Sequence, residues 1–453
     1  MILNYFKCLK KNPLYTILTL KSRDININFN LEYMDYFEIQ GGKKLSGTID
    51  VRGSKNATTP ILAATVLTSG ECVISNIPLI EDVYRMIEIL QSMDVEVSWE
   101  GERTVKICAK NLDPSKIDLV TVKKLRSSIL LLGSLSARAE SFKIAHPGGC
   151  TIGKRPVGTH FDALEKMGVH IVQDEECYVI DTREKKSAKV VLQGFSVTAT
   201  ENAMMLAASL PGKTIIKIAA AEPHVEDLGK FLVSMGAEIK GLGTHTLEII
   251  GNENLRGAHH EIIPDANEAA TFLILGVATK SPIRVENARE ENLDLVLEKL
   301  REFGAEFKIE ENAIEVIPTD KLRAIEKIDT RTYPGIPTDI QAPLGVLATQ
   351  AEGETIIFDT MFEGRFNYIS ELEKMRAKAK ILNPHQAVII GPSKLKGSSI
   401  KSFDLRAGAS LIIAALTARG TTTIEEIYQV DRGYERIEER LAALGADIKR
   451  ISK

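Results

Sequence analysis

The sequence is poor in cysteine, and its few cysteines are not spaced as metal ligands or as a disulfide framework. Five are present among 453 residues: Cys8, Cys72, Cys108, Cys150 and Cys177. The number is odd and no pair has C-x-x-C spacing, which argues against structural disulfides and against a zinc site. The eight histidines contain no H-E-x-x-H pattern. We therefore expect a reducing, cytoplasmic location and no metal.

Long apolar runs and a large excess of charge are also missing. The segment Leu411–Leu416 is far shorter than the roughly 18 apolar residues that suggest a membrane-spanning helix. A net charge of −4 does not predict nucleic-acid binding, so an anion site must come from a local cluster of cations. Hydrophobic residues make up 44% of the chain and charged residues 26%, as in ordinary globular proteins. A length of 453 residues is too great for one core and predicts two domains.

Residues 1–33 differ from the rest of the chain, because patterned sequence begins only at Met34. Lysines and Pro13 interrupt any apolar stretch in this leader, so we do not expect a cleaved signal peptide. Two interpretations remain. In the first, which we favour, Met34 is the true start and the leader is upstream sequence; in the second, the leader is a basic targeting arm.

From Met34 onward the chain repeats itself. A helix end, a Gly-Ala-like turn and a strand recur six times at intervals of about 70 residues, near Met93, Met167, Met235, Phe303, Met375 and Leu444. Each unit contains an apolar helix, a strand, an amphipathic helix such as Val225–Met235 and a closing strand, and in four of the six units a glycine suited to a left-handed C-cap follows the amphipathic helix. Alternating helices and strands predict an α/β fold of six units, three in each of two domains.

The first candidate site is the segment around Lys55. Ser54 or Asn56 can cap the following helix, which leaves Lys55 at a helix N-terminus. A cation is unfavourable beside the positive end of the helix dipole unless an anion joins it, so the pattern favours an anion ligand. A solvated loop lysine is an equally weighted alternative.

The second candidate is the loop from Pro147 to Gly158, half of which is glycine or proline. It holds Cys150 close to Lys154 and Arg155, and cationic neighbours favour the thiolate form of cysteine. An inert thiol is the alternative, but we favour a reactive one, because Cys72 and Cys108 lie in apolar strand patterns and Cys150 does not.

Four arginines in punctuated segments form the third group: Arg126, Arg365, Arg406 and Arg432. A guanidinium group matches carboxylate and phosphate oxygens in pairs, so these residues are candidate anion ligands. Taken singly, each is more simply a surface ion pair, and Asp339 is more simply a helix N-cap.

Taken together and in order, these motifs resemble those of the bacterial UDP-N-acetylglucosamine 1-carboxyvinyltransferases, the enolpyruvyl transferases that open peptidoglycan precursor synthesis. The resemblance runs from about Met34 to the end of the chain. It rests on Gly53–Ala57, Pro147–Val157, Ser196–Val197 followed by Ala-Thr-Glu-Asn, Glu222–Pro223, Pro264–Asp265, Ile336–Asp339, Phe362–Phe366, Asp404–Ala407 and Asp431–Arg436. The related shikimate-pathway enzymes share the six-unit plan but differ in the lysine motif and lack the Pro-Gly-Gly-Cys loop.

The resemblance implies an α/β fold of two inside-out, barrel-like domains with three repeats each. One domain would span residues 55–263. The other would combine residues 34–54 with residues 264–453. The active site would lie in the cleft between them.

The resemblance also implies the reaction and its residues. Enolpyruvyl would move from phosphoenolpyruvate to the sugar 3-hydroxyl by addition and elimination. Cys150 would be the general acid, able to form a covalent thioketal with phosphoenolpyruvate and to react with fosfomycin, and Asp339 would be the base. Lys55, Arg155 and Arg432 would bind phosphoenolpyruvate, with Arg126 and Arg406 nearby. Asn56 would hold the sugar, and Arg365 would serve domain closure. The substrate pocket would also include Pro156, Val157, Gly158, Thr159, Ser196, Val197 and Met361. No cofactor, metal, nucleic acid, membrane or obligate protein partner is implied.

Three positions depart from the family pattern. Gly158 stands where the family usually has aspartate, Ala266 where it often has arginine, and Met361 where it usually has valine. These departures concern nucleotide affinity more than reaction type. They leave two alternatives open: an enolpyruvyl transferase with another acceptor, and a regulatory paralogue that binds a nucleotide sugar without turnover.

Overall fold

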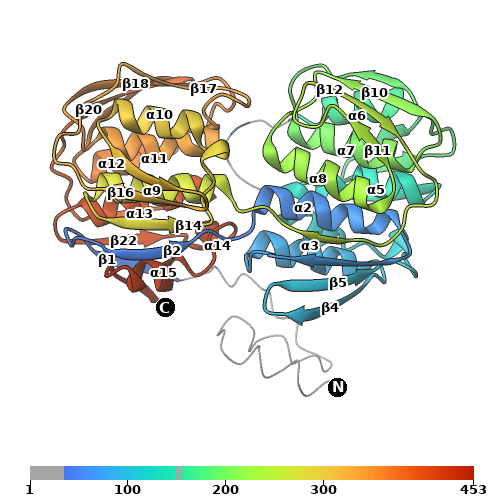
Figure 1. The fold of residues 1–453 in the computed structure, drawn as a ribbon, viewed down its shortest axis with the longest axis horizontal. Helices are drawn as coiled ribbons and strands as arrows, with labels where there is room; N and C mark the ends of the chain where they lie inside the picture. Colours follow the sequence, from blue (N-terminus) through green and yellow to red (C-terminus); the bar gives the residue numbers. More distant parts are fainter. Residues whose placement is uncertain (1–34, 149–152, 154–155, 453) are drawn as a thin grey trace. The chain divides into compact units, whose positions relative to one another are not determined.

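A computed structural model describes residues 35–148, 153 and 156–452. The leader 1–33 and the loop residues Cys150, Lys154 and Arg155 lie outside the described residues. From Asp35 onward the chain forms one compact unit with two hydrophobic cores. One core is built from residues 57–262 and the other from residues 37–51 and 269–448. We call the elements around these cores the first and the second lobe, respectively (Figure 1).

Each lobe has three small sheets in the part of the chain that the structure describes. The strands of the first lobe, in sheet order, are β13 (His259–Glu261), β3 (Glu71–Ser75), β5 (Thr104–Cys108) and β4 (Glu96–Gly101); β6 (Ser141–Ala145), β8 (Cys177–Asp181) and β7 (His170–Gln173); and β11 (Glu238–Lys240), β12 (Thr246–Ile250), β10 (Lys213–Lys217) and β9 (Lys189–Val191).

The strands of the second lobe, in sheet order, are β21 (Ser399–Lys401), β22 (Thr421–Glu425), β1 (Tyr36–Gln40) and β23 (Asp447–Ile451); β15 (Glu306–Glu310), β16 (Ala313–Ile317), β14 (Ile283–Glu286) and β2 (Gly47–Asp50); and β17 (Lys327–Thr330), β18 (Gly353–Asp359), β20 (Gln386–Gly391) and β19 (Lys378–Asn383). The N-terminal strands thus complete sheets of the C-terminal half. Strand β2, for example, pairs in parallel with β14, with Gly47 opposite Ile283.

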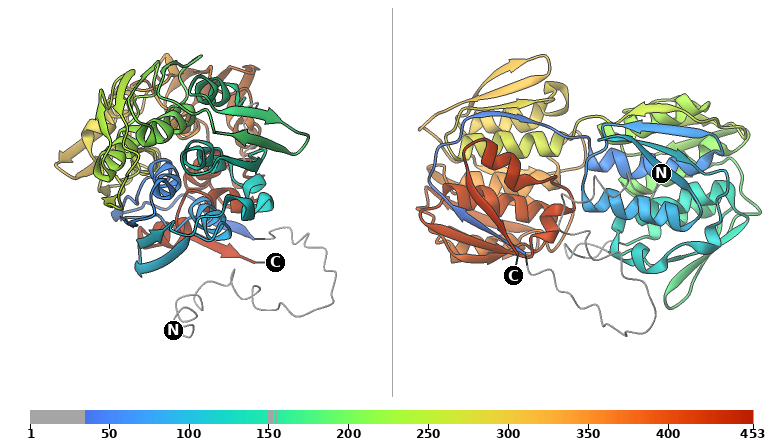
Figure 2. Two further views of the ribbon diagram at one scale, coloured as in Figure 1. Left: turned by 90° about the vertical axis from the view of Figure 1, so that its right-hand side faces the viewer. Right: turned by 90° about the horizontal axis from the view of Figure 1, so that it is seen from below.

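Six helices are buried along nearly their whole circumference: α2 (Lys55–Ala64), α5 (Leu131–Arg138), α7 (Val197–Ser209), α9 (Ala266–Ala278), α11 (Thr338–Ala348) and α13 (Leu405–Thr417). A helix that is apolar on all sides must lie inside a core. Figures 1 and 2 show helices inside each lobe with sheets toward its outside. The predicted inside-out α/β fold with three units in each domain is therefore confirmed.

One amphipathic helix accompanies each unit: α3 (Glu81–Ser92), α6 (Gly158–Lys166), α8 (Pro223–Met235), α10 (Asp294–Glu302), α12 (Asn367–Lys374) and α15 (Ile437–Ala443). The left-handed C-cap predicted after these helices is present at Gly236, with φ 114°. Asp94 and Arg376 adopt the same left-handed conformation where their units lack glycine, with φ 60° and 71°.

Short segments complete the lobes: α4 (Leu119–Lys124), α14 (Tyr428–Asp431), η2 (Thr65–Leu67), η3 (Pro114–Lys116), η4 (Arg126–Leu130) and η5 (Glu290–Asn292). Among residues 35–148 and 156–452, every helix is too short or too polar to cross a membrane.

The chain passes between the lobes twice, and the two passages run side by side. Gly53 and Pro264 form an antiparallel bridge, the amide of Ser54 donates to the carbonyl of Ile263 at 2.7 Å, and the amide of Asp265 donates to the carbonyl of Arg52 at 2.9 Å. A Cβ atom at position 53 would lie 1.8 Å from the carbonyl oxygen of Asn76. Only glycine fits this crossing without a shift of backbone, and the crossing fixes where helix α2 begins.

Candidate active site

Lys55 lies where the chain enters the first lobe. Ser54 is the N-cap of α2, and its hydroxyl accepts a hydrogen bond from the amide of Ala57 at 3.3 Å. The amide of Lys55 donates to the carboxylate of Asp265 at 3.3 Å. The prediction that a capped helix leaves Lys55 at its N-terminus is confirmed, with Ser54 as the cap. Asn56 follows as the second residue of the helix and is half-buried.

A buried carboxylate, that of Asp82 in the first turn of α3, joins Lys55 to an arginine of the second lobe. Lys55 Nζ lies 3.0 Å from Asp82 Oδ2. Arg432 donates through Nε to Oδ1 at 2.9 Å and through Nη2 to Oδ2 at 3.4 Å. Burial by itself would raise the pKa of Asp82, but the charges of Lys55 and Arg432 bring it below its usual value. The carboxylate is therefore ionised at neutral pH.

A second carboxylate, that of Asp339, is held by two arginines. Arg365 Nη2 donates to Asp339 Oδ1 at 2.6 Å, and Arg406 Nε donates to Oδ2 at 3.1 Å. Burial would raise the pKa of Asp339, but the charges of Arg406, Arg365 and Lys55 lower it well below its usual value. Since Lys55 acts electrostatically on Asp339 and directly contacts Asp82, the two carboxylate clusters belong to one charged region.

Two of the simpler interpretations of these residues are wrong. The N-cap of α11 is Pro337, and Asp339 lies one residue inside the helix, where its carboxylate faces arginines instead of backbone amides. Arg365, Arg406 and Arg432 are not surface ion pairs either, since they are only 8%, 2% and 7% exposed. Buried charges persist only when they are paired, so these arginines belong to an internal network.

Several residues that support this network were not singled out from the sequence. Arg406 Nη1 donates to the hydroxyl of Tyr434 at 3.2 Å, and this hydroxyl lies 2.9 Å from that of Thr271. Arg365 Nη1 lies 3.6 Å from Asp404 Oδ1, and Asp404 is the N-cap of α13. Tyr434 lies inside the Asp-Arg-Gly-Tyr-Glu-Arg motif, and this motif was the sequence signal that could have identified it. No sequence signal pointed to Asp82, because an acidic residue in the first turn of a helix is common.

Two described glycines of the glycine-rich loop, Gly148 and Gly153, lie close to other segments of the protein. A Cβ atom at Gly148 would lie 1.7 Å from the carbonyl oxygen of Lys123, so the loop starts tightly packed on the first lobe. A Cβ atom at Gly153 would lie 3.2 Å from the amide nitrogen of Glu363. Gly153 therefore lies close to the second lobe at Glu363, which precedes Arg365 by two residues. The predictions for Cys150 and Arg155 fall outside the described residues.

The predicted nucleotide-pocket residues of the first lobe cluster at helix starts. Gly158 begins α6 after the exposed Pro156 and the half-buried Val157, with Thr159 next in the helix. Ser196 caps α7, its hydroxyl accepting from the amide of Ala199 at 3.3 Å, and Val197 begins that helix. His160 Nε2 lies 2.7 Å from Thr198 Oγ1, which ties the two helix starts together. Two helix N-termini favour an anion such as a diphosphate.

Arg126 and Met361 complete the predicted set. Arg126 begins η4 and donates to the carbonyl of Pro147, where the loop starts, at 3.5 Å, and burial lowers its pKa. Met361 follows β18 in the second lobe, with its amide donating to Asp359 Oδ1 at 2.8 Å. Within the described residues, neither Ser196 nor Met361 bonds directly to Asp82 or Asp339. The structure thus brings the charged residues into direct contact with one another, whereas the residues predicted for the nucleotide pocket make no hydrogen bond or ion pair with Asp82 or Asp339 in the part of the chain that the structure describes.

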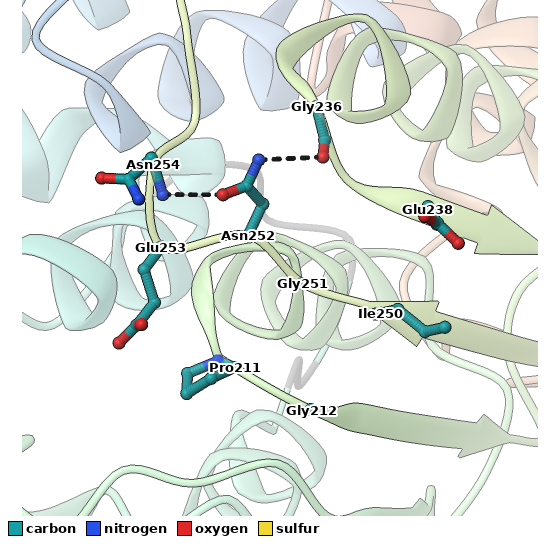
Figure 3. A pocket seen from close by; sticks show the side chains of 9 residues that line it. All are labelled: Pro211, Gly212, Gly236, Glu238, Ile250, Gly251, Asn252, Glu253 and Asn254. Carbon is teal, nitrogen blue, oxygen red and sulfur yellow. Dashed lines mark hydrogen bonds between the residues drawn. The ribbon is translucent and has the colours of Figure 1, made fainter.

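A surface pocket lies elsewhere in the first lobe and includes none of the predicted residues (Figure 3). It is lined at the ends of β10, β12 and α8. Asn252 donates to the carbonyl of Gly236 at 3.2 Å and accepts from the amide of Asn254 at 2.9 Å. Two carboxylates, those of Glu238 and Glu253, also line the pocket, but the described residues that line it include no lysine or arginine. The pocket therefore does not suit an anionic substrate, and the charged region remains the candidate active site.

Known proteins match this chain along nearly its whole length. The EPSP synthase (3-phosphoshikimate 1-carboxyvinyltransferase) family matches residues 39–441. The UDP-N-acetylglucosamine 1-carboxyvinyltransferase 2 of Listeria innocua is 42% identical over 412 residues, which are 91% of this chain and 97% of that protein. The UDP-N-acetylglucosamine 1-carboxyvinyltransferase of Wolinella succinogenes is 42% identical over 421 residues, 92% of this chain and 99% of that protein.

Solved structures agree on the fold. The enolpyruvyl transferase NikO from Streptomyces tendae superposes with a TM-score of 0.84 at 24% identity, covering 93% of this chain and 99% of that one. EPSP synthase from Acinetobacter baumannii superposes with a TM-score of 0.72 at 20% identity, covering 92% of this chain and 100% of that one. The solved structures show the fold, and the sequence matches show that the chain belongs to the EPSP synthase family and, within it, to the UDP-N-acetylglucosamine 1-carboxyvinyltransferases.

Proposed function

We propose that this protein transfers the enolpyruvyl group of phosphoenolpyruvate to the 3-hydroxyl of UDP-N-acetylglucosamine and releases phosphate. This is the first committed step of peptidoglycan precursor synthesis, which places the protein in the cytoplasm. One observation carries the proposal: Lys55 of the first lobe and Arg432 of the second contact the same carboxylate, and the charge of Lys55 also acts on Asp339 of the second lobe. The chain that carries this arrangement is 42% identical to a protein named for this reaction.

Phosphoenolpyruvate brings a phosphate and a carboxylate, and both need cations. Lys55 and Arg432 are assigned to these groups together with Arg155, and Arg126 and Arg406 stand nearby. Hydrogen bonds between charged groups contribute roughly 1.5–3 kcal/mol each, so several are needed to offset desolvation of the ligand. Since the cations come from both lobes, binding of the anion holds the lobes together and excludes water from the reaction.

In the addition step, the sugar 3-oxygen bonds to C2 of phosphoenolpyruvate. The Cys150 thiol gives its proton to the methylene carbon, which becomes a methyl group, and the hydroxyl proton passes to Asp339. A carboxylate with a lowered pKa is a weak base, so this transfer occurs late. Once the new carbon–oxygen bond is forming, the proton on the sugar oxygen is far more acidic than in a free alcohol, and a weak base suffices.

In the elimination step, the Cys150 thiolate takes a proton back from the methyl group of the tetrahedral ketal. The bond between C2 and the phosphate oxygen breaks with its electron pair leaving on the phosphate, which takes up the proton held by Asp339. The enolpyruvyl ether and inorganic phosphate are the products, so no cofactor is needed. The Cys150 thiol can also add across the double bond of phosphoenolpyruvate, its sulfur bonding to C2 and its proton passing to the methylene carbon, which gives the covalent thioketal.

The acceptor would be held by Asn56 at the sugar and by the first-lobe helix starts at the nucleotide. Gly158 is the weak point of this assignment, since it contributes no side chain and a Cβ atom there would meet nothing within 4 Å. That open space motivates the second candidate, transfer to another acceptor, and the same experiment must distinguish the two.

The test is phosphate release from phosphoenolpyruvate by protein begun at Met34, with UDP-N-acetylglucosamine, with shikimate 3-phosphate, or with no acceptor. Release that depends on the nucleotide sugar supports the proposal. Release with shikimate phosphate alone would favour the second candidate, and no release despite nucleotide binding would favour a regulatory paralogue. Cys150→Ser should lower turnover by orders of magnitude, whereas Cys177→Ser, in strand β8, should retain it.

A further inference from the structure

The proposed phosphoenolpyruvate site contains an ionised group that the reaction does not consume. Asp82 is 4% exposed and its two oxygens contact Lys55 and Arg432, two of the cations assigned to the substrate anion. The lysine belongs to the first lobe and the arginine to the second. Without a carboxylate between them, two like charges would face each other across the lobe boundary in a buried setting, which is unfavourable.

We propose that Asp82 is a positioning residue, whose carboxylate holds Lys55 and Arg432 together across the two lobes and so presents them as one phosphoenolpyruvate-binding pair. This inference rests on the proposed function of these two cations. It assigns to Asp82 no contact with the reacting atoms.

Positioning fits the geometry better than simple competition with the substrate. Arg432 uses Nε and Nη2 toward Asp82 and Nη1 toward Gln429 Oε1 at 3.1 Å, so its guanidinium plane is fixed from two sides. A lysine ammonium carries three donors, so Lys55 can hold Asp82 and a ligand oxygen at once. One carboxylate against two cations also leaves a net positive charge for the incoming anion.

The backbone around Arg432 has its own attachment to the first lobe. Glu435 accepts from Nη1 and Nη2 of Arg103 at 2.5 Å each and from the amide of Leu79 at 2.9 Å. Leu79 and Asp82 lie in the same stretch at the start of α3. Loss of the Asp82 charge should therefore disturb the direction of the Arg432 side chain more than the docking of its segment, and the variant should fold.

The test compares Asp82→Asn, which keeps the shape and removes the charge, with Asp82→Glu, which keeps the charge on a longer side chain. The matched control is Glu88→Gln, which removes a carboxylate of the same helix that pairs with Arg85 at 2.7 Å. We expect Asp82→Asn to raise KM for phosphoenolpyruvate by roughly tenfold or more, and KM for UDP-N-acetylglucosamine by less than about threefold. Asp82→Glu should recover part of the loss, and Glu88→Gln should match the wild type.

A binding readout separates this proposal from the proposed function. Phosphoenolpyruvate alone should raise the melting temperature of the wild type, and Asp82→Asn should need roughly ten times more of it for the same shift. In an Arg432→Lys background, Asp82→Asn should have little further effect on KM, because it acts through that arginine.

Other results would overturn the proposal in different ways. Tighter binding of phosphoenolpyruvate by Asp82→Asn would make Asp82 a competitor of the substrate, and equal losses for both substrates would make it merely structural. If the wild type itself neither binds nor turns over phosphoenolpyruvate, the proposed function fails and this inference fails with it. If the wild type is active and Asp82→Asn behaves like Glu88→Gln, only the positioning role is lost.

Discussion

Replacing Arg365 by glutamine should change how strongly the reaction depends on acid pH. Arg365 is 9% and Asp339 22% exposed at the side chain, and their contact is 2.6 Å. An opposite charge this close lowers a carboxyl pKa by about 1–3 units. Because Arg406 remains in place, we expect the change to raise the pKa of Asp339 by about 1–2 units, or about 1.4–2.7 kcal/mol. The pKa of Asp339 in the variant would still not exceed the usual aspartate value of about 4, so protonation would begin only near and below pH 4, where the wild type keeps Asp339 ionised.

The assay is phosphate release, measured from pH 3.5 to 9 and expressed as the ratio of kcat/KM between Arg365→Gln and the wild type. Groups that titrate alike in the two proteins cancel in this ratio. We expect the ratio to be constant above about pH 5 and to decline only as the pH falls below about 4. The control Arg331→Gln, which removes an exposed partner of Asp329, should give a constant ratio. A uniformly low ratio for Arg365→Gln would refute the reasoning, since Arg365 would then act on geometry alone.

The same substitution has a consequence for stability. Because the folded-state pKa of Asp339 lies below its usual value, its ionisation stabilises the fold above about pH 4 and this contribution is lost as the pH falls further. Arg365→Gln should remove part of it. The melting temperatures of variant and wild type should therefore differ by a constant amount above about pH 4 and begin to converge only below it, as Asp339 of the variant takes up its proton first.

Three further substitutions test the crossing, the contact between the lobes and the nucleotide pocket. Gly53→Ala should destabilise the fold by about 3 kcal/mol or more, seen as a lower melting temperature, while Gly194→Ala, where a Cβ atom meets nothing within 4 Å, should not. Glu435→Gln should cost about 2–3 kcal/mol by leaving Arg103 without a buried partner charge; a urea midpoint equal to that of the control Glu439→Gln would contradict this. Gly158→Asp should place a carboxylate at the start of α6 and raise stability by about 0.3–1 kcal/mol. It should also lower KM for UDP-N-acetylglucosamine, and an unchanged KM would remove position 158 from the nucleotide pocket.

Much of the fold could be predicted from local sequence because each unit carries its own pattern. Six apolar helices, six amphipathic helices and left-handed turns repeat about every 70 residues. The prediction for Val225–Met235 was two residues short, since Pro223 occupies the first helical turn, a position that proline tolerates. The pairing of β1 with β22 and β23 could not be derived from local patterns. It joins segments about 400 residues apart and was implied only by the family resemblance.

The candidate site was predicted as a list of residues, but its charges could not be paired in advance. The sequence pattern pointed to Lys55, Arg365, Arg406 and Arg432 as cations with unspecified partners. It offered a helix cap for Asp339, which is the commonest use of an acidic residue near a helix start. Asp339 instead accepts hydrogen bonds from the buried guanidinium groups of Arg365 and Arg406. This contact brings three separate segments of the chain together, and local sequence does not show which segments meet.

The pairing of these charges explains how the fold can hold several buried cations in a site that binds anions. A buried cation without a partner is costly, so a pocket lined only with lysine and arginine would destabilise the fold. Here Asp82 accompanies Lys55 and Arg432, and Asp339 accompanies Arg365 and Arg406. Asp404, 3.6 Å from Arg365, balances the charge of the second cluster. Asp82 alone faces two cations, so its cluster keeps one unit of positive charge. That residual charge is what an anionic substrate meets, and it is delivered by groups from both lobes only when those lobes are together.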